Sequence, residues 1–175
     1  MSTLLSVDPG LRGCGCALWR DGQLVRTAYV RGSDDQEASF ADVVEAMAEA
    51  AHTWQAEVRA FFVTHEGPMR LVIERQRVYG GRAARGDASD LIDVAVVVGA
   101  IVGRLGVPSR IVLPQEWGCA EKSVNMERVK RDLSLAELAR VELPGSRGRV
   151  NKKLSENVYD AVAIGLWALR QTRER

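Results

Sequence analysis

Histidine and cysteine are scarce in this sequence, with 2 histidines and 3 cysteines among 175 residues. A structural zinc site needs four ligands at metal spacing, and His52 and His65 form no such pattern. Three cysteines cannot all pair, and Cys14 and Cys16 lie in one strand-like apolar segment. We therefore expect no zinc site, and we expect reduced cysteines that pack as small hydrophobic side chains.

Long apolar runs are missing as well. No stretch approaches the roughly 20 apolar residues that a membrane-spanning helix requires, and the first residues lack the basic segment that opens a signal peptide. We expect a cytoplasmic protein with no membrane partner. Apolar residues make up 46% and charged residues 27% of the chain, as in ordinary globular proteins. The length predicts a single domain over residues 1–175.

The formal net charge is only +1, but the charges are unevenly distributed. Every charged residue from 34 to 57 is acidic. Five of the six charged residues from 70 to 85 are arginines, and a second basic stretch covers 147–153. Separate acidic and basic faces would suit a partner that carries phosphates. Solvated loops explain the same pattern equally well.

Turn residues and hydrophobic periodicity predict the element order β-β-β-α-β-α-β-α-α. The predicted strands are 4–7, 13–19, 23–30, 69–73 and 110–113, and the predicted helices are 39–62, 89–105, 122–138 with a possible break near Ser134, and 155–170 capped by Ser155. Three strands in series followed by two crossover units indicate an α/β fold. The expected sheet is mixed, with three antiparallel and two parallel strands and helices on both faces. That order fits a ribonuclease-H-like sheet.

Three carboxylates stand in apolar surroundings. Asp8 and Glu74 each end an apolar strand, and Asp160 is the only charged residue in the segment 158–166. A buried carboxylate is costly unless a partner neutralises it, although a helix cap or a buried ion pair would explain any one of them alone. If the first and fourth strands are neighbours, all three side chains can meet at one spot. Clustered oxygens without histidine or cysteine suit a hard cation such as Mg²⁺.

Four segments resemble the motifs of the RuvC-type Holliday-junction resolvases, which are crossover junction endodeoxyribonucleases of the ribonuclease-H-like superfamily. In chain order they are Leu5-Ser6-Val7-Asp8-Pro9-Gly10 with Gly13 and Gly15, Val72-Ile73-Glu74, Ala120-Glu121-Lys122-Ser123, and Asn157-Val158-Tyr159-Asp160-Ala161-Val162-Ala163. The resemblance covers nearly the whole chain, in order and at plausible spacing.

The resemblance implies a metal-dependent endonuclease that nicks four-way DNA junctions symmetrically. It implies that Asp8, Glu74 and Asp160 are catalytic metal ligands, with two Mg²⁺ ions per active site and Mn²⁺ as a substitute. The chain departs from the family at one position, since bacterial members usually carry an aspartate where this sequence has Asn157. The fourth ligand is therefore either the neutral Asn157 or Glu156.

Basic residues near these motifs are candidate DNA contacts. Tyr79 is a candidate for stacking on an unpaired base at the junction centre, and packing of its ring on the sheet is an equally good alternative. The loop that contains Gly80, Gly81 and Gly86 is expected to be mobile. The full set of candidate DNA contacts is Arg75, Arg77, Tyr79, Arg82, Arg85, Lys122, Lys130, Lys152 and Lys153.

A branched DNA with approximate two-fold symmetry needs two matched cuts, so we expect a homodimer. The predicted helix 89–105 is apolar over more than one stripe, and the excess could pack against a second copy or be buried within one domain. No residue pattern indicates a branch-migration motor as a further partner.

Three other readings remain open. The chain could be a junction-binding protein, or a nuclease of other branched DNA, whose catalysis is weakened by Asn157. It could be an actin-like ATPase or sugar kinase domain, although those proteins need two such domains and about twice this length. It could also be an interaction domain with incidental carboxylates.

Overall fold

The computed structural model describes residues 2–11, 13–31, 39–61, 69–76, 88–118, 120–141 and 152–173. Five strands form one sheet in the order β3-β2-β1-β4-β5. The strands are β1 (Thr3–Pro9), β2 (Gly13–Arg20), β3 (Gln23–Arg31), β4 (Met69–Glu74) and β5 (Ser109–Val112). The first three strands are antiparallel, and β4 and β5 continue the sheet parallel to β1. The predicted mixed sheet is confirmed.

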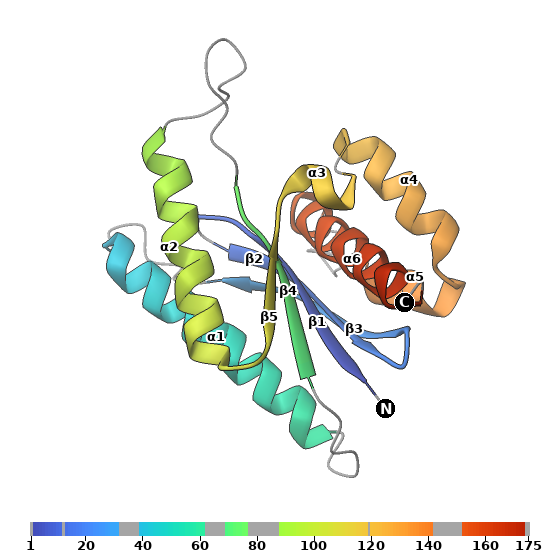
Figure 1. The fold of residues 1–175 in the computed structure, drawn as a ribbon, viewed down its shortest axis with the longest axis horizontal. Helices are drawn as coiled ribbons and strands as arrows, with labels where there is room; N and C mark the ends of the chain where they lie inside the picture. The colour runs from blue at the N-terminus through green and yellow to red at the C-terminus, as the bar shows by residue number, and fades with distance from the viewer. Residues whose placement is uncertain are drawn as a thin grey trace.

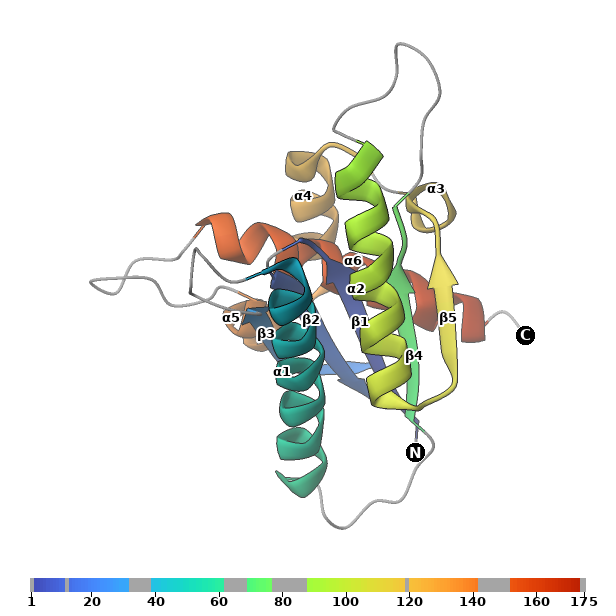
Figure 2. The same cartoon turned by 90° about the vertical axis from the view of Figure 1, so that its left-hand side faces the viewer.

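Helices cover both faces of this sheet (Figure 1). They are α1 (Phe40–Phe61), α2 (Ala88–Leu105), α3 (Pro114–Trp117), α4 (Lys122–Asp132), α5 (Leu135–Val141) and α6 (Lys152–Arg173). Helices α1 and α2 lie side by side on one face, and α6 crosses the other face with α4 and α5 beside it (Figures 1 and 2). None of the described helices combines the length and the hydrophobicity that a bilayer crossing requires.

Alternation along the strands divides the apolar residues into two cores. Leu5 and Val7 of β1 point toward α1 and α2, where Leu71 and Ile73 of β4 join them in one buried cluster. Leu4 of β1 belongs to the other cluster, beneath α6. Asp8 is four residues after Leu4 and lies on the same face of β1, so its carboxylate points toward α6.

The two cysteines within the described residues are free and buried. Burial raises the pKa of the Cys14 thiol to about 12. Both side chains belong to the core beneath α1 and α2, as the sequence predicts.

The helix predictions hold with two corrections. The predicted break near Ser134 separates α4 from α5, but the short helix α3 was not predicted. The prediction that Ser155 caps the last helix was wrong, because α6 begins three residues earlier and the serine is buried inside it. Serine is frequent at the N-cap of helices, but the sequence alone does not distinguish a capping serine from one inside a helix. The glycine-containing loop 80–86 lies outside the described residues.

Helix α6 lies unusually close to β2, and two glycines permit the approach. A methyl group on Gly15 would overlap the backbone carbonyl of Asn157, and one on Gly165 would overlap the indole ring of Trp19. Gly165 also lies above the Ser6 hydroxyl, which accepts a hydrogen bond from Trp19 Nε1 at 3.0 Å. The position of α6 on the sheet is therefore fixed at two points along the helix, Asn157 and Gly165.

We expect Gly15→Ala to lower the free energy of unfolding by about 3 kcal/mol or more, because the new methyl group meets backbone that cannot move aside. Urea denaturation followed by circular dichroism measures this. Ala56→Ser, at an exposed position of α1, is the control, and we expect it to change the free energy of unfolding by less than about 0.5 kcal/mol. Equal effects of the two substitutions would contradict the close-packing argument.

Candidate active site

Three elements bring the carboxylates of Asp8, Glu74 and Asp160 to one place. Strands β1 and β4 are parallel neighbours with Val7 opposite Ile73, so the next residues, Asp8 and Glu74, lie side by side. On the other side of β1, Asp8 is paired with Gly15, which lies against the Asn157 backbone of α6. Asp160 follows Asn157 by about one helical turn and therefore faces the same spot.

The carboxylates are close enough to repel one another. Burial, and next the charges of Glu74 and Asp160, raise the pKa of Asp8 well above its ordinary value. Burial and the charge of Asp160 also raise the pKa of Glu74, to about 7, although a hydrogen bond from Trp117 opposes the shift. Burial likewise raises the pKa of Asp160. The fold thus holds three acidic groups in a place where their charged forms are destabilised.

Three neutral side chains donate to these carboxylates, and none was predicted from the sequence: Gln76 donates weakly to Glu74 Oε1 at 3.5 Å, and the other two are buried donors. Trp117 of α3 donates from Nε1 to Glu74 Oε2 at 2.6 Å, and Asn125 of α4 donates from Nδ2 to Asp160 Oδ1 at 3.3 Å. Both side chains are buried. Asn125 could have been noticed in the sequence, because it is a neutral polar residue on the side of the charged helix α4 that faces the core. A buried amide at such a position needs a hydrogen-bond partner. Donors behind carboxylates of this kind fix the orientation of a ligand set.

Lys122 opens α4 and faces α6. Its ammonium lies 3.9 Å from Asp160 Oδ2, 3.8 Å from Glu156 Oε2 and 3.4 Å from Asn157 Oδ1. The Asn157 side chain also forms a hydrogen bond with Tyr29. Both candidates for the fourth ligand therefore share the ammonium of Lys122 with Asp160.

The chemistry of this donor set fits a hard cation. All the candidate ligands are oxygens, and no described residue donates a hydrogen bond to Asp8. Its carboxylate therefore lacks a neutralising partner within the described chain except for the nearby charge of Lys122. However, no three Asp, Glu, His or Cys side chains among the described residues are gathered closely enough to hold a metal ion as they stand. Ion binding would require these side chains to move together.

The structure describes only some of the candidate DNA contacts. Arg75 is exposed directly after β4, where its backbone N–H donates to Val112 O at 2.8 Å. Lys130 lies eight residues beyond Lys122 on α4, about 12 Å along the axis, and pairs with Glu127. Lys152 and Lys153 begin α6, but their side chains lie outside the described residues, as do Arg77, Tyr79, Arg82 and Arg85 altogether.

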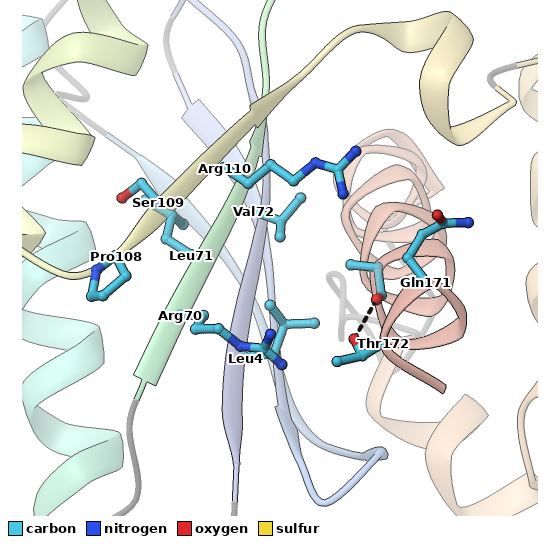
Figure 3. Close-up of a pocket in the computed structure, with 10 residues that line it drawn as sticks. Leu4, Arg70, Leu71, Val72, Pro108, Ser109, Arg110, Gln171 and Thr172 are labelled. Atoms are coloured by element: carbon cyan, nitrogen blue, oxygen red, sulfur yellow. Dashed lines mark hydrogen bonds between the residues drawn. The ribbon is translucent and has the colours of Figure 1, made fainter. Parts of the chain in front are cut away.

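A cavity of about 250 Å³ lies under the same face of the sheet but away from the carboxylates, between the beginnings of β4 and β5 and the end of α6 (Figure 3). Its lining is mostly apolar, with Arg70 and Arg110 at the sheet side. The Arg110 guanidinium lies 4.6 Å from the centre of a Trp167 ring and 3.5 Å from Glu116. Among the described residues, neither arginine contacts any of the candidate metal ligands. The cavity is therefore separate from the candidate active site, which we place at the three carboxylates.

The raised pKa of Glu74 has a consequence for stability. Between its ordinary value of 4.5 and about 7, the folded protein keeps a proton that the unfolded chain has lost, so stability should fall as pH rises through this window. We expect Glu74→Gln to reduce this loss of stability with pH and to stabilise the metal-free protein at about pH 8 by on the order of 2 kcal/mol.

Urea denaturation in a chelating buffer at several pH values measures both effects. Glu45→Gln, at an exposed position of α1, is the control. An unchanged pH profile in Glu74→Gln would show that this carboxyl titrates normally.

No protein-family model matches the sequence, and no curated protein matches it either. Solved structures do resemble its fold. Thermus thermophilus RuvC in complex with a Holliday-junction substrate is similar with a TM-score of 0.61 and 20% identity over 99% of this chain and 96% of that chain. A second structure of T. thermophilus RuvC gives a TM-score of 0.58 and 21% identity over 98% and 96% of the two chains.

The yeast mitochondrial Holliday junction resolvase is also similar, with a TM-score of 0.50 and 14% identity over 98% of this chain and 81% of that chain. These resemblances extend over nearly the full length of the chain, and they agree with the strand order and the two helical layers described above. The chain therefore has the ribonuclease-H-like fold of the RuvC-type Holliday-junction resolvases.

Proposed function

We propose that this protein is a metal-dependent endonuclease that resolves four-way DNA junctions by paired, symmetric hydrolysis of phosphodiester bonds. The observation that carries the proposal is that three separate elements bring Asp8, Glu74 and Asp160 together. Burial and mutual repulsion destabilise their charged forms, and the fold itself gains nothing from this arrangement. Structural likeness to resolvases, one of them bound to a Holliday junction, supports the choice of DNA substrate.

Each residue has a distinct role in this proposal. Asp8, Glu74 and Asp160 hold Mg²⁺ or Mn²⁺, which when bound supplies Lewis-acid activation of a water and neutralises charge on the phosphate. Trp117 and Asn125 keep two of the carboxylates oriented. Arg75 and the basic residues that follow it in sequence hold the DNA backbone beside the scissile bond.

The proposal includes a homodimer, because two cuts related by two-fold symmetry need two active sites. Helix α2 offers the surface. Ile92 and Val96 are 64% and 48% exposed, and open space surrounds Gly99 and Gly103. These four residues are spaced by four, three and four positions, so they share one face of the helix. The exposed acidic side chain of Glu45 on the neighbouring α1 would repel a symmetric copy, so we centre the contact on α2.

Asp8→Asn should abolish cleavage of a synthetic four-way junction in Mg²⁺ while preserving binding of the junction, because the change removes a ligand charge and lowers repulsion toward phosphate. Denaturing gels measure the cleavage and gel shifts measure the binding. Glu45→Gln, at an exposed position of α1 on the face of the sheet opposite α6, should leave both unchanged. Junction binding by the unmodified chain without any cleavage would instead favour a junction-binding protein, in keeping with the neutral Asn157. ATP turnover would favour the kinase alternative.

Arg75→Ala should weaken junction binding and reduce the slope of log K against log salt by about one unit for one lost phosphate contact. Fluorescence anisotropy across a salt series measures the slope. Arg131→Ala, at an exposed position near the end of α4, is the control for loss of one positive charge. Equal slopes for Arg75→Ala and the unmodified protein would remove Arg75 from the interface.

Val96→Glu should convert the dimer to a monomer at micromolar concentration, because it places a charge at the centre of an apolar two-fold contact. Sedimentation velocity measures the state. The matched control is Leu135→Glu, since Leu135 is 87% exposed but lies on α5 on the opposite face of the sheet. A monomeric unmodified protein that stays monomeric on junction DNA would rule out the dimer.

A further inference from the structure

A second cavity lies between α6 and the two helices that contact it, α3 and α4 (Figure 1). Its volume is about 180 Å³, which is smaller than the roughly 300–1,000 Å³ of pockets for drug-sized ligands and suits a single flat ring system. Trp117 and Asn125 line this cavity, and they also donate the hydrogen bonds to Glu74 and Asp160. The cavity is therefore adjacent to the three carboxylates, with these two side chains between them.

An aromatic ring lines the cavity and is supported from behind. Trp167 of α6 is only partly buried there. The guanidinium of Arg110 lies over the Trp167 ring, 4.6 Å from its centre, and Arg110 lines the first cavity and not this one. An indole held by a guanidinium is a fixed platform. Nucleobases of any sequence stack on such platforms in proteins that bind single-stranded nucleic acid.

The cavity also has an excess of positive charge. The charged residues that line it within the described chain are Arg128, Arg131, Asp132 and Arg170, which together leave two positive charges unbalanced. Asp132 is paired with Arg170 and lies 3.8 Å from Arg131. Arg128 has no carboxylate partner among the described residues, and its Nη1 donates to Gly118 O at 2.8 Å. Because a guanidinium has five N–H groups, Arg128 retains donors for a phosphate.

The distance from the carboxylates fits a position on the same DNA strand. Trp167 is seven residues beyond Asp160 on α6, which is about 10 Å along the helix axis. A stacked strand advances about 3.4 Å per nucleotide, so this distance corresponds to about three nucleotides. A base within a duplex is covered by its neighbours, and only an unpaired base can enter the cavity.

We propose that this cavity binds one unpaired nucleotide of the DNA strand, about three nucleotides from the phosphate at the carboxylates, with its base on the Trp167 ring and its phosphate at Arg128. The inference rests on the proposed nuclease function, which places the DNA strand at the carboxylates. It adds a preference among substrates, because a junction with unpaired nucleotides beside its branch point fills the cavity and a fully paired junction does not.

The test compares two four-way junctions that differ only in a short gap, which leaves nucleotides unpaired beside the branch point. Fluorescence anisotropy with the full-length protein in a chelating buffer measures binding without cleavage. We expect the gapped junction to bind about tenfold more tightly, which is within the range of one base stacked on an aromatic ring. The ratio of the two affinities is the readout, because partial loss of folded protein lowers both equally.

Trp167→Leu should remove most of this preference, and Trp167→Phe, which keeps a ring, should retain part of it. Arg128→Gln should reduce the preference about threefold. The matched control is Arg70→Gln, which removes one exposed positive charge on the same face of the sheet but at the first cavity. We expect this control to keep the full preference.

Photo-cross-linking locates the nucleotide directly. In the gapped junction, 5-iododeoxyuridine replaces each unpaired nucleotide in turn, and mass spectrometry identifies the residue that it joins on irradiation. We expect a cross-link to Trp167 from the position about three nucleotides from the cleaved phosphate. Thymidine monophosphate should not displace the gapped junction, and displacement would assign the cavity to a free nucleotide and overturn its assignment to DNA.

Equal affinities for the two junctions would overturn the inference, as would a preference that survives both Trp167→Leu and Arg128→Gln. Cleavage of the fully paired junction by the same protein would then leave the proposed function standing. If Trp167→Leu does not fold, as circular dichroism would show, Arg128→Gln and the cross-link decide. Failure to bind either junction would overturn both this inference and the proposed function.

Discussion

The close contact between α6 and β2 is the constraint on which the candidate active site depends. Gly15 and Gly165 remove the side chains that would otherwise hold the helix away from the sheet. Because Gly15 is the strand partner of Asp8, the helix backbone at Asn157 is fixed next to that carboxylate. Asp160 then reaches the cluster from one turn further along the helix. A larger residue at either glycine would displace α6, and with it one of the three acidic groups.

Gathering carboxylates in this way opposes stability, and the surrounding residues offset the cost only in part. Trp117 and Asn125 each donate one hydrogen bond, and Lys122 contributes a single positive charge. The pKa of Asp8 and of Glu74 nevertheless remains raised. A group of charges that destabilises its own fold is typical of a site selected for binding or catalysis rather than for structure.

The two faces of the sheet have different roles in the proposed enzyme. Beneath α6 lie the carboxylates and the donors that orient them, while α1 and α2 cover the other face and leave apolar residues of α2 exposed. The sheet thus separates the reacting groups of one chain from the surface that we propose for its partner. Such a separation lets two active sites face one branched DNA without either being covered by the dimer contact.

Local patterns in the sequence determined the order of strands and helices along the chain, the position of most helices and the identity of the three carboxylates. Asp8, Glu74 and Asp160 are conspicuous because a charge in an apolar run is costly wherever the run is buried. The partners of these residues depend on the tertiary structure. Trp117 belongs to a short helix with too few residues for a periodic signal, and Asn125 and Tyr29 lie far from the carboxylates in sequence. The roles of Trp117 and Asn125 arise only when α3 and α4 pack against the sheet and α6. A hydrogen bond of about 3 Å between residues distant in sequence forms only where the tertiary structure brings whole elements together.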